Sequence, residues 1–390
     1  MVERLSNLVA IFQKPELDFS KNRAENDDIL GDAYEYLMRH FATESGKSKS
    51  QFYTPSEISR IMAKVLGITP QNTKASTTAF DPTCGSGSLL LKLAVEAGKH
   101  ITLEGQEMDM TTAGLARMNM ILHDFPTANI LTGNTLSDPK FKDGEKLRTY
   151  DLVVANPPFS VKTWSTGLTP SNDPYQRFEW GEPPAKQGDY AFLLHIIRSM
   201  KSTGKGACIL PHGVLFRGNA EAVIRRNLVR SGILKGIIGL PANLFYGTGI
   251  PACILVLDKE NATARKGIFM IDASKGFIKD GNKNRLRERD LHQIVDVFTN
   301  TEEHPATPAS SPWMKSRRTT PTSTCPATST PRRPRTSRTS AVISLAVSLH
   351  GTLMLSTTTG TSAPNSVPPS SSLPALAIPR SAPQPPKLSR

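Results

Sequence analysis

Cysteine is scarce in this chain of 390 residues. The four cysteines, Cys84, Cys208, Cys253 and Cys325, lie far apart and form no Cys-x-x-Cys pair, which argues against a disulfide framework and against a zinc site. The chain also lacks an apolar run long enough to cross a bilayer, and its first residues lack the charged start and apolar core of a signal peptide. We therefore expect a cytoplasmic protein with no membrane segment and no metal site.

Acidic residues are absent from position 305 onward. The same stretch holds ten Lys or Arg residues and fifteen of the 30 prolines, and it is rich in Ser and Thr. Its ten positive charges account for most of the formal net charge of +13, so residues 1–304 carry only +3, which by itself does not predict a nucleic-acid partner. Because this composition cannot bury enough apolar surface to fold, we expect residues 305–390 to form a disordered, basic, low-complexity tail.

Apolar residues at helical spacing predict two helices near the N-terminus. The first would use Leu5, Leu8 and Phe12, and the second would lie around residues 29–41. Two helices cannot enclose much core. We therefore interpret residues 1–50 as a helical segment that packs on the domain after it, or as the remnant of a larger helical domain.

Strands and helices alternate regularly from about residue 78 to residue 258, within a folded domain expected to span residues 51–304. Seven segments are predicted as strands: 78–81, 101–107, 128–134, 151–155, 206–211, 234–240 and 252–258. Helical crossovers between most of them predict an α/β fold with a mostly parallel sheet covered on both faces. The short link between the last two predicts an antiparallel excursion at one edge of the sheet.

The segment Asp151-Leu-Val-Val-Ala-Asn156-Pro157-Pro158-Phe159 organises the functional interpretation. Four apolar residues predict a buried strand, and the two prolines that follow stiffen the turn at its carboxyl end, where open α/β sheets bind ligands. The turn offers an amide oxygen on Asn156, a carbonyl oxygen on Pro157 and the ring of Phe159. Two acceptors beside an aromatic face suit a planar ring with an exocyclic amino group, such as adenine. The structural alternative is a Pro-Pro loop that merely ends a core strand.

Residues 161–184 follow this turn without any periodicity and are rich in Trp, Pro and Gly. A loop of this length is more often functional than a plain connector. We therefore predict that it is a mobile lid or contacts substrate.

The segment Gln51-Phe52-Tyr53-Thr54-Pro55-Ser56 predicts a sharp helix start. Thr54 would be the N-cap, Pro55 would occupy the first helical position, and Glu57 would complete a capping box. Such a helix start offers free N–H groups to an anion such as a carboxylate. The alternative is an ordinary, well-capped surface helix.

A glycine-containing turn, Asp81-Pro-Thr-Cys84-Gly85-Ser86-Gly87, follows the first predicted strand. It is a weak dinucleotide signal because only two of the three expected glycines are present. An acid at Asp81 would repel a pyrophosphate and pair with an amine, which favours an amino-acid-bearing nucleotide over NAD. Glu107 ends the second strand, where a carboxylate binds ribose hydroxyls. Asn134, after the third strand, is a further candidate for contact with a base.

Together these motifs resemble the amino-methyltransferases that use S-adenosyl-L-methionine, in the order found in γ-type adenine-N6 DNA methyltransferases. Three further stretches resemble the modification subunit of type I restriction-modification systems, and they are Gly31-Asp-Ala-Tyr-Glu-Tyr-Leu, Leu210-Pro-His-Gly-Val-Leu-Phe-Arg-Gly and Gly239-Leu-Pro-Ala-Asn-Leu-Phe-Tyr-Gly-Thr-Gly-Ile-Pro. The resemblance covers residues 25–300. It implies a Rossmann-like, seven-stranded methyltransferase sheet.

The resemblance also implies roles for individual residues. The Gln51–Ser56 segment (Gln51, Phe52, Tyr53, Thr54, Pro55, Ser56), Asp81 and the Cys84–Gly87 turn would hold the cofactor, and Glu107 its ribose. Asn156, Pro157, Pro158 and Phe159 would hold the target adenine, with Phe245 and Tyr246 close by. One departure is Gly133-Asn134, where the family usually has Gly-Asp, and the missing carboxylate weakens the case for tight cofactor binding.

The expected partners are double-stranded DNA, a specificity subunit that reads the sequence, a second modification subunit and the restriction/translocase subunit. Two other functions remain open: a truncated protein that binds the cofactor without catalysis, and methylation of RNA or of a protein glutamine. The tail allows two interpretations as well. It is either a basic arm that adds nonspecific DNA affinity, or the product of a frame shift near residue 305, which is favoured because the family continues there with helical sequence.

Overall fold

A computed structural model describes residues 54–98, 100–245 and 248–303, together with isolated positions at 6, 7, 10, 14 and 36. Several predictions therefore fall outside the described residues. They concern the helical segment 1–50, the motif residues Gln51, Phe52 and Tyr53, the loop residue Tyr246 and the tail 305–390.

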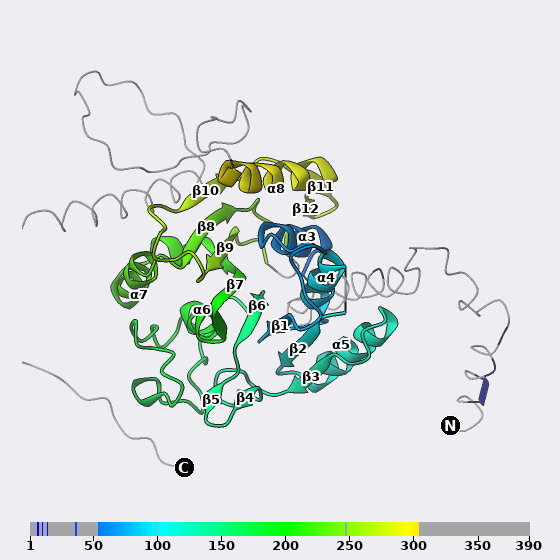
Figure 1. The fold of residues 1–390 in the computed structure, drawn as a ribbon, viewed down its shortest axis with the longest axis horizontal. Coiled ribbons are helices and arrows are strands. Elements are labelled where there is room, and N and C mark those ends of the chain that lie inside the picture. Colours follow the sequence, from blue (N-terminus) through cyan, green and yellow to red (C-terminus); the bar gives the residue numbers. More distant parts are fainter. Residues whose placement is uncertain are drawn as a thin grey trace, which may run out of the picture.

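The described part of the chain folds as a sheet with helices on both faces (Figure 1). The sheet strands are β1 (Thr78–Asp81), β2 (Thr102–Glu107), β3 (Asn129–Thr132), β6 (Tyr150–Ala155), β7 (Met200–Pro211), β8 (Leu234–Gly239), β9 (Ala252–Asp258) and β10 (Phe269–Asp272). The helices are α3 (Ser56–Val65), α4 (Ser88–Ala97), α5 (Met110–Leu122), α6 (Asp189–Arg198), α7 (Asn219–Arg230) and α8 (Glu288–Glu303), with 3-10 turns η4 (Pro170–Asn172) and η5 (His212–Leu215).

The strand order is β10-β8-β9-β7-β6-β1-β2-β3. Every neighbouring pair is parallel except the two pairs made by β9, which runs antiparallel to both β7 and β8. The predicted α/β class with a mostly parallel sheet is confirmed. The predicted strand count was wrong, because β10 adds an eighth strand whose four residues are too few to show periodicity. The antiparallel strand was predicted at one edge of the sheet, and this was also wrong, because β9 lies in the interior with β8 and β10 beyond it.

Two short antiparallel ribbons stand apart from this sheet. One pairs β4 (Lys142–Asp143) with β5 (Lys146–Leu147), and the other pairs β11 (Ile278–Asp280) with β12 (Lys283–Arg285). The second ribbon lies close to the loop between β8 and β9, because Asn284 N donates a hydrogen bond to Asn243 O at 2.9 Å.

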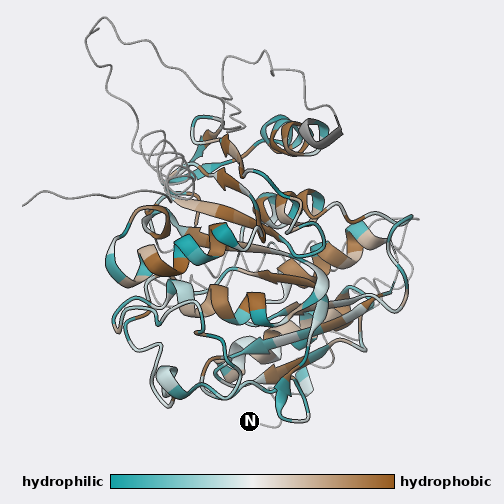
Figure 2. Ribbon diagram, turned by 60° about the vertical axis from the view of Figure 1, so that its left-hand side comes forward, coloured by the Kyte–Doolittle hydropathy of each residue, from teal (hydrophilic) through white to brown (hydrophobic). Residues whose placement is uncertain are grey.

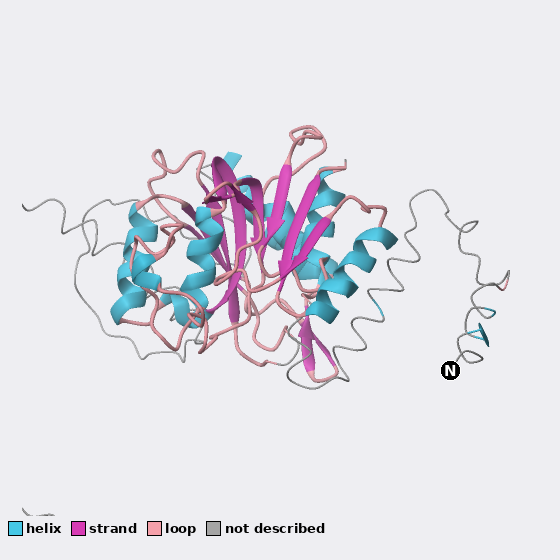
Figure 3. Cartoon of the chain, turned by 90° about the horizontal axis from the view of Figure 1, so that it is seen from below, coloured by secondary structure: helices cyan, strands magenta, loops and turns pink. Residues whose placement is uncertain are grey.

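Two apolar clusters stabilise the fold, one on each face of the sheet. The first contains buried residues of α3, α4, α5 and α8, and the second contains those of α6 and α7. Figure 2 shows hydrophobic segments running along the central strands, and Figure 3 shows helices flanking the strands on both sides. This layering explains why β9, with all seven residues buried, reads as a continuous apolar run. No helix among the described ranges is long and apolar enough to cross a membrane.

The parallel strands bring their carboxyl ends to one rim of the sheet. β1 ends at Asp81, β2 at Glu107, β3 at Thr132 and β6 at Ala155, directly before Asn156. Adjacent parallel strands therefore place the acidic residues and the Asn-Pro-Pro-Phe turn side by side, which is the arrangement that positions a ligand in open α/β sheets.

Candidate functional site

A cavity of about 1020 Å³ opens at this rim. Eight of the predicted site residues line it, and they are Thr54, Asp81, Cys84, Gly85, Glu107, Asn134, Asn156 and Pro158. The remaining described candidates do not line it, and they are Pro55, Ser56, Ser86, Gly87, Pro157 and Phe159. The structure thus joins residues from the start of α3, from β1, β2 and β3, and from the turn after β6.

Thr54 does not cap the helix as predicted. The helix α3 begins at Ser56, its N-cap is Pro55, and no side chain caps it. Instead, Thr54 Oγ1 accepts a hydrogen bond from Asn156 Nδ2 at 3.0 Å. The capping prediction was wrong because the helix begins one residue later than expected, which puts Pro55 at the N-cap and leaves Thr54 outside the capping position.

The amide oxygen of Asn156 is buried and has no hydrogen-bond partner in the structure. Buried polar atoms without partners are rare in folded proteins and require an explanation. Since Asn156 also lines the cavity, its oxygen is available to a donor on a ligand. The next residues differ in exposure: Pro157 is buried, Pro158 is exposed, and the ring of Phe159 is half-buried against Phe245, edge to face at 5.8 Å between centroids.

The two glycines of the turn after β1 face different surroundings. Gly85 (φ 54°) lines the cavity, and its N–H donates to Glu107 Oε2 at 3.0 Å. Gly87 (φ 81°) faces packed protein, because a Cβ there would lie 2.4 Å from Met120 Cε. Ser86 is buried beside Gly87, and its carbonyl accepts from Asn119 Nδ2 at 2.8 Å. Only the first half of the turn is therefore placed to approach a ligand directly.

Two buried carboxylates face the cavity. Asp81 Oδ1 accepts from Thr83 N at 2.9 Å, whereas Asp81 Oδ2 is buried without a partner. Burial, with a contribution from the nearby Glu107, raises the pKa of Asp81 to about 8. Burial also raises the pKa of Glu107, whose oxygens accept from the backbone N–H groups of Gly85 and Asp109. Such a pair suits a ligand that carries positive charge and hydroxyl groups.

The wall on the side of β3 is built from a buried polar chain. Asn134 Oδ1 accepts from Leu136 N at 2.9 Å, and the neighbouring Thr135 Oγ1 lies 3.3 Å from His195 Nε2. Arg177 Nη1 lies 3.2 Å from His195 Nδ1. Through Nη2 and Nε the same guanidinium forms a fully buried ion pair with Asp173. Arg177 and burial lower the pKa of His195, burial being the larger cause, so the ring is neutral.

The long loop after the turn is packed rather than open. Trp164 is buried, and its Nε1 donates to Pro184 O at 2.9 Å, which ties the two ends of the loop together. Five of its residues line the cavity, namely Val161, Thr163, Trp164, Thr166 and Gly167. The structure thus places the loop where a substrate contact is possible.

A second loop, between β8 and β9, brings Phe245 against Phe159. Lys283 of β12 holds this loop, since its Nζ donates to Phe245 O at 2.6 Å and to Thr248 O at 3.1 Å. Asn243 Nδ2 in turn donates to Asn282 O at 2.5 Å. The small β11–β12 ribbon therefore fixes the position of an aromatic residue that contacts the Asn-Pro-Pro-Phe turn.

A sequence profile described as N-6 DNA Methylase matches residues 25–314, which is most of the chain. The chain belongs to the N-6 DNA methylase family. The resemblance inferred from the motifs is therefore confirmed at the level of the family.

The chain is similar to methylase subunits of type I restriction enzymes. It is 35% identical over 314 residues to the MpnII methylase subunit of Mycoplasma pneumoniae, covering 77% of this chain and 56% of that protein. It is 33% identical over 315 residues to the MjaVII methylase subunit of Methanocaldococcus jannaschii, covering 77% and 52%. The chain thus spans about half the length of these relatives.

Solved structures of type I methylase subunits share the fold. The type I methyltransferase subunit from Streptococcus thermophilus superposes with a TM-score of 0.63 at 35% identity, covering 71% of this chain and 58% of that one. A modification subunit of a putative type I restriction enzyme from Vibrio vulnificus YJ016 superposes with a TM-score of 0.56 at 20% identity, covering 76% and 61%. The methylase-type sheet is therefore shared with these proteins.

The sequence alone did not identify several residues that shape the site. The buried His195 and the clamp made by Lys283 carry no local signal, because each contacts residues far away in the sequence. Arg177 and Asp173 are only four residues apart, but they lie in a loop without periodicity, where the pattern gives no reason to expect a buried ion pair. Asp189 could only be read as the acidic first residue of a helix, although its carboxylate contacts the residue after Phe159.

Proposed function

We propose that this chain is the modification subunit of a type I restriction-modification system and methylates N6 of adenine in DNA with S-adenosyl-L-methionine. The observation that carries the proposal is the buried, unpartnered oxygen of Asn156 at the rim of a cavity that also contains the unpartnered Asp81 Oδ2. One acceptor suits the amino group of a base, and the other suits a cationic cofactor.

The residues of the cavity fit the cofactor. Asp81 would pair with an α-amino group, and Glu107 would accept from ribose hydroxyls. Gly85 would let the backbone approach, because it has no side chain. Asn134, at the far side of the cavity, is the candidate for contact with the adenine ring. The Gln51–Tyr53 segment before Thr54 would complete the site. When bound, S-adenosyl-L-methionine supplies a methyl group on a positively charged sulfur.

The Asn-Pro-Pro-Phe turn would bind the target base. Adenine N6 is inaccessible in a stacked duplex, so the base must rotate out at a cost of about a few kcal/mol. Stacking on Phe159 would return about 1–3 kcal/mol of this. Asn156 Oδ1 and the carbonyl of Pro157 would accept the two amino hydrogens and direct the nitrogen lone pair toward the methyl group. Positioning supplies much of the rate, and the proton leaves to water or to Asn156.

DNA reading would come from a partner. No separate base-reading module is evident in the sequence. The relatives are methylase subunits of type I restriction enzymes, which supports partners in a larger complex. By the family resemblance these would be a specificity subunit, a second modification subunit and a restriction/translocase subunit. The proposal is tested by measuring transfer of tritiated methyl to duplex DNA by the full chain with and without its cognate specificity subunit.

We expect adenine methylation at defined sites only when both subunits are present. Site-specific methylation by the chain alone would refute the proposed division of labour. Cofactor binding in a calorimeter without methylation by the complex would select the alternative, a non-catalytic cofactor-binding protein. Transfer of the methyl group to RNA or to a protein glutamine, with none to DNA, would select the second alternative, an amino-methyltransferase that acts on RNA or protein.

A further inference from the structure

The residue that follows the Asn-Pro-Pro-Phe turn has an unusual backbone. Ser160 adopts a φ of 54°, in the left-handed region of backbone conformations that residues other than glycine rarely occupy. This conformation costs about 1–2 kcal/mol, so other contacts must hold it. It also sets the direction in which the chain leaves Phe159.

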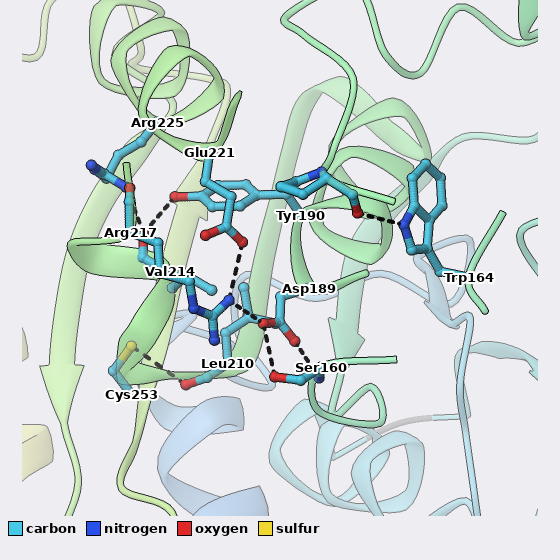
Figure 4. A network of polar contacts seen from close by, with 11 residues as sticks. Ser160, Trp164, Asp189, Tyr190, Leu210, Val214, Arg217, Glu221, Arg225 and Cys253 are labelled. Atoms are coloured by element: carbon cyan, nitrogen blue, oxygen red, sulfur yellow. Dashed lines mark hydrogen bonds and ion pairs between the residues drawn. The ribbon is translucent and has the colours of Figure 1, made fainter. Parts of the chain in front are cut away.

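Asp189 supplies those contacts. Its Oδ1 accepts from Ser160 N at 2.7 Å, and its Oδ2 lies 3.4 Å from Ser160 Oγ. Oδ2 also accepts from Arg217 Nη1 at 2.8 Å, and the same guanidinium nitrogen donates to Glu221 Oε1 at 3.0 Å. Figure 4 shows these groups converging, with Asp189 between Ser160 and Arg217.

Asp189 is fully buried and acts between segments, not within its own helix. It is the first residue of α6, yet no side chain caps that helix, and the carboxylate instead joins the turn after β6 to the segment after η5. Gly188 N also donates to Val161 O at 3.0 Å, so the long loop is closed at its base by two neighbouring contacts.

We propose that Asp189 is a positioning residue that fixes Phe159 for the flipped base by holding Ser160 in its left-handed conformation. The inference rests on the proposed function, because it assigns to Phe159 the stacking role described above. A buried carboxylate is suited to this task, since a charge-assisted hydrogen bond to a backbone N–H is stronger than a neutral one. Arg217 orients that carboxylate through the hydrogen bond from its Nη1 to Oδ2.

The substitution Asp189→Asn separates the two contacts. An asparagine has one oxygen, and the charged Arg217 competes for it more strongly than a backbone N–H does. The amide nitrogen would then face Ser160 N–H, and the turn would lose its anchor. Ser160→Ala is the matched control, because it retains the N–H donor and removes only the long hydroxyl contact.

The position of the ring can be measured without any assay of activity. Phe159 is replaced by para-fluorophenylalanine in the full chain, and fluorine NMR is recorded for the otherwise native protein and for each variant. We expect Ser160→Ala to leave the resonance unchanged and Asp189→Asn to shift or split it. If Asp189→Asn does not fold, Asp189→Glu takes its place, and its displaced carboxylate should also move the resonance.

Kinetics supply the second readout. In the complex with the specificity subunit, Asp189→Asn should slow single-turnover methyl transfer by about 100-fold, as expected for a misplaced reacting group. The dissociation constant for S-adenosyl-L-methionine should change by less than about twofold, because the cofactor residues are untouched. An unchanged fluorine resonance in folded Asp189→Asn, or an equal change in Ser160→Ala, would overturn the inference. A wild-type complex that does not methylate would defeat the proposed function instead, while the resonance would still decide the role of Asp189.

Discussion

Asn156 Nδ2 donates a hydrogen bond to Thr54 Oγ1 at 3.0 Å across a sequence separation of 102 residues. The bond fixes which end of the amide faces the cavity, because the nitrogen is engaged and the oxygen remains free. The residue before helix α3 thereby orients the acceptor that would receive an amino hydrogen of the base.

Thr54→Val should therefore weaken methylation without unfolding the protein. Valine has nearly the same shape but cannot accept the hydrogen bond, so the amide of Asn156 becomes free to rotate. We expect methyl transfer to fall by about 10-fold, as for loss of one positioned hydrogen bond. Thr54→Ser keeps the hydroxyl and should retain most of the rate. Equal rates for the two variants, measured in single-turnover assays, would contradict this role.

Asp81→Asn should affect stability and cofactor binding in opposite directions. Burial raises the pKa of Asp81 to about 8, so the folded state holds this proton more tightly than the unfolded state does. The resulting stability is fully present below the ordinary pKa near 4 and is lost as the pH rises through about 8. The substitution removes this loss, and it also removes the partner of a cationic cofactor.

We therefore expect ligand-free Asp81→Asn to be more stable than wild type at pH 8, on the order of 2 kcal/mol, with a smaller difference at pH 5. Its affinity for S-adenosyl-L-methionine should fall. Thermal melts at both pH values and calorimetry measure the two effects. Asp296→Asn, which changes an exposed aspartate on α8, is the control and should alter neither the stability nor the cofactor affinity. A stability gain in Asp296→Asn as large as that in Asp81→Asn would contradict the prediction.

Lys283→Met should loosen the loop that carries Phe245. The ammonium donates to two carbonyl oxygens of that loop, and methionine keeps the length of the side chain but donates nothing. We expect a stability loss of about 1–2 kcal/mol and a raised KM for DNA, with cofactor affinity unchanged. Lys275→Met, at an exposed position before the same ribbon, is the control. A normal KM for DNA in Lys283→Met would show that the loop needs no such clamp.

Gly87→Ala should destabilise the fold more than the same change at Gly67. Both glycines have a positive φ, but a Cβ at Gly87 would lie 2.4 Å from Met120 Cε, whereas a Cβ at Gly67 has no atom within 4 Å. Gly67→Ala should cost about 1 kcal/mol. Gly87→Ala should cost up to about 1 kcal/mol more, because the terminal methyl group of the buried Met120 must move to make room. Denaturant unfolding measures both, and equal losses would mean that the contact with Met120 relaxes freely.

The sequence predicted those features that depend on neighbouring residues. The buried strand before Asn156 and the glycine turn after β1 have local patterns, and parallel strands bring their carboxyl ends together. The features that it did not predict depend on distant residues. Thr54 reads as a helix cap until Asn156 is placed beside it, and Asp189 reads as a helix start until Ser160 and Arg217 reach its carboxylate. β10 was missed because it is a strand only through its pairing with β8.

The reversed direction of β9 determines which part of this fold can vary in length without disturbing the sheet. Phe245, between β8 and β9, contacts Phe159 of the Asn-Pro-Pro-Phe turn. Because β8 ends and β9 begins at the same rim, the connection that carries Phe245 needs no helix to return to the sheet. Its length and composition can vary while every core strand keeps its register. Under the proposed function, selectivity for the target base could change through insertions in this connection while the strands of the sheet keep their positions.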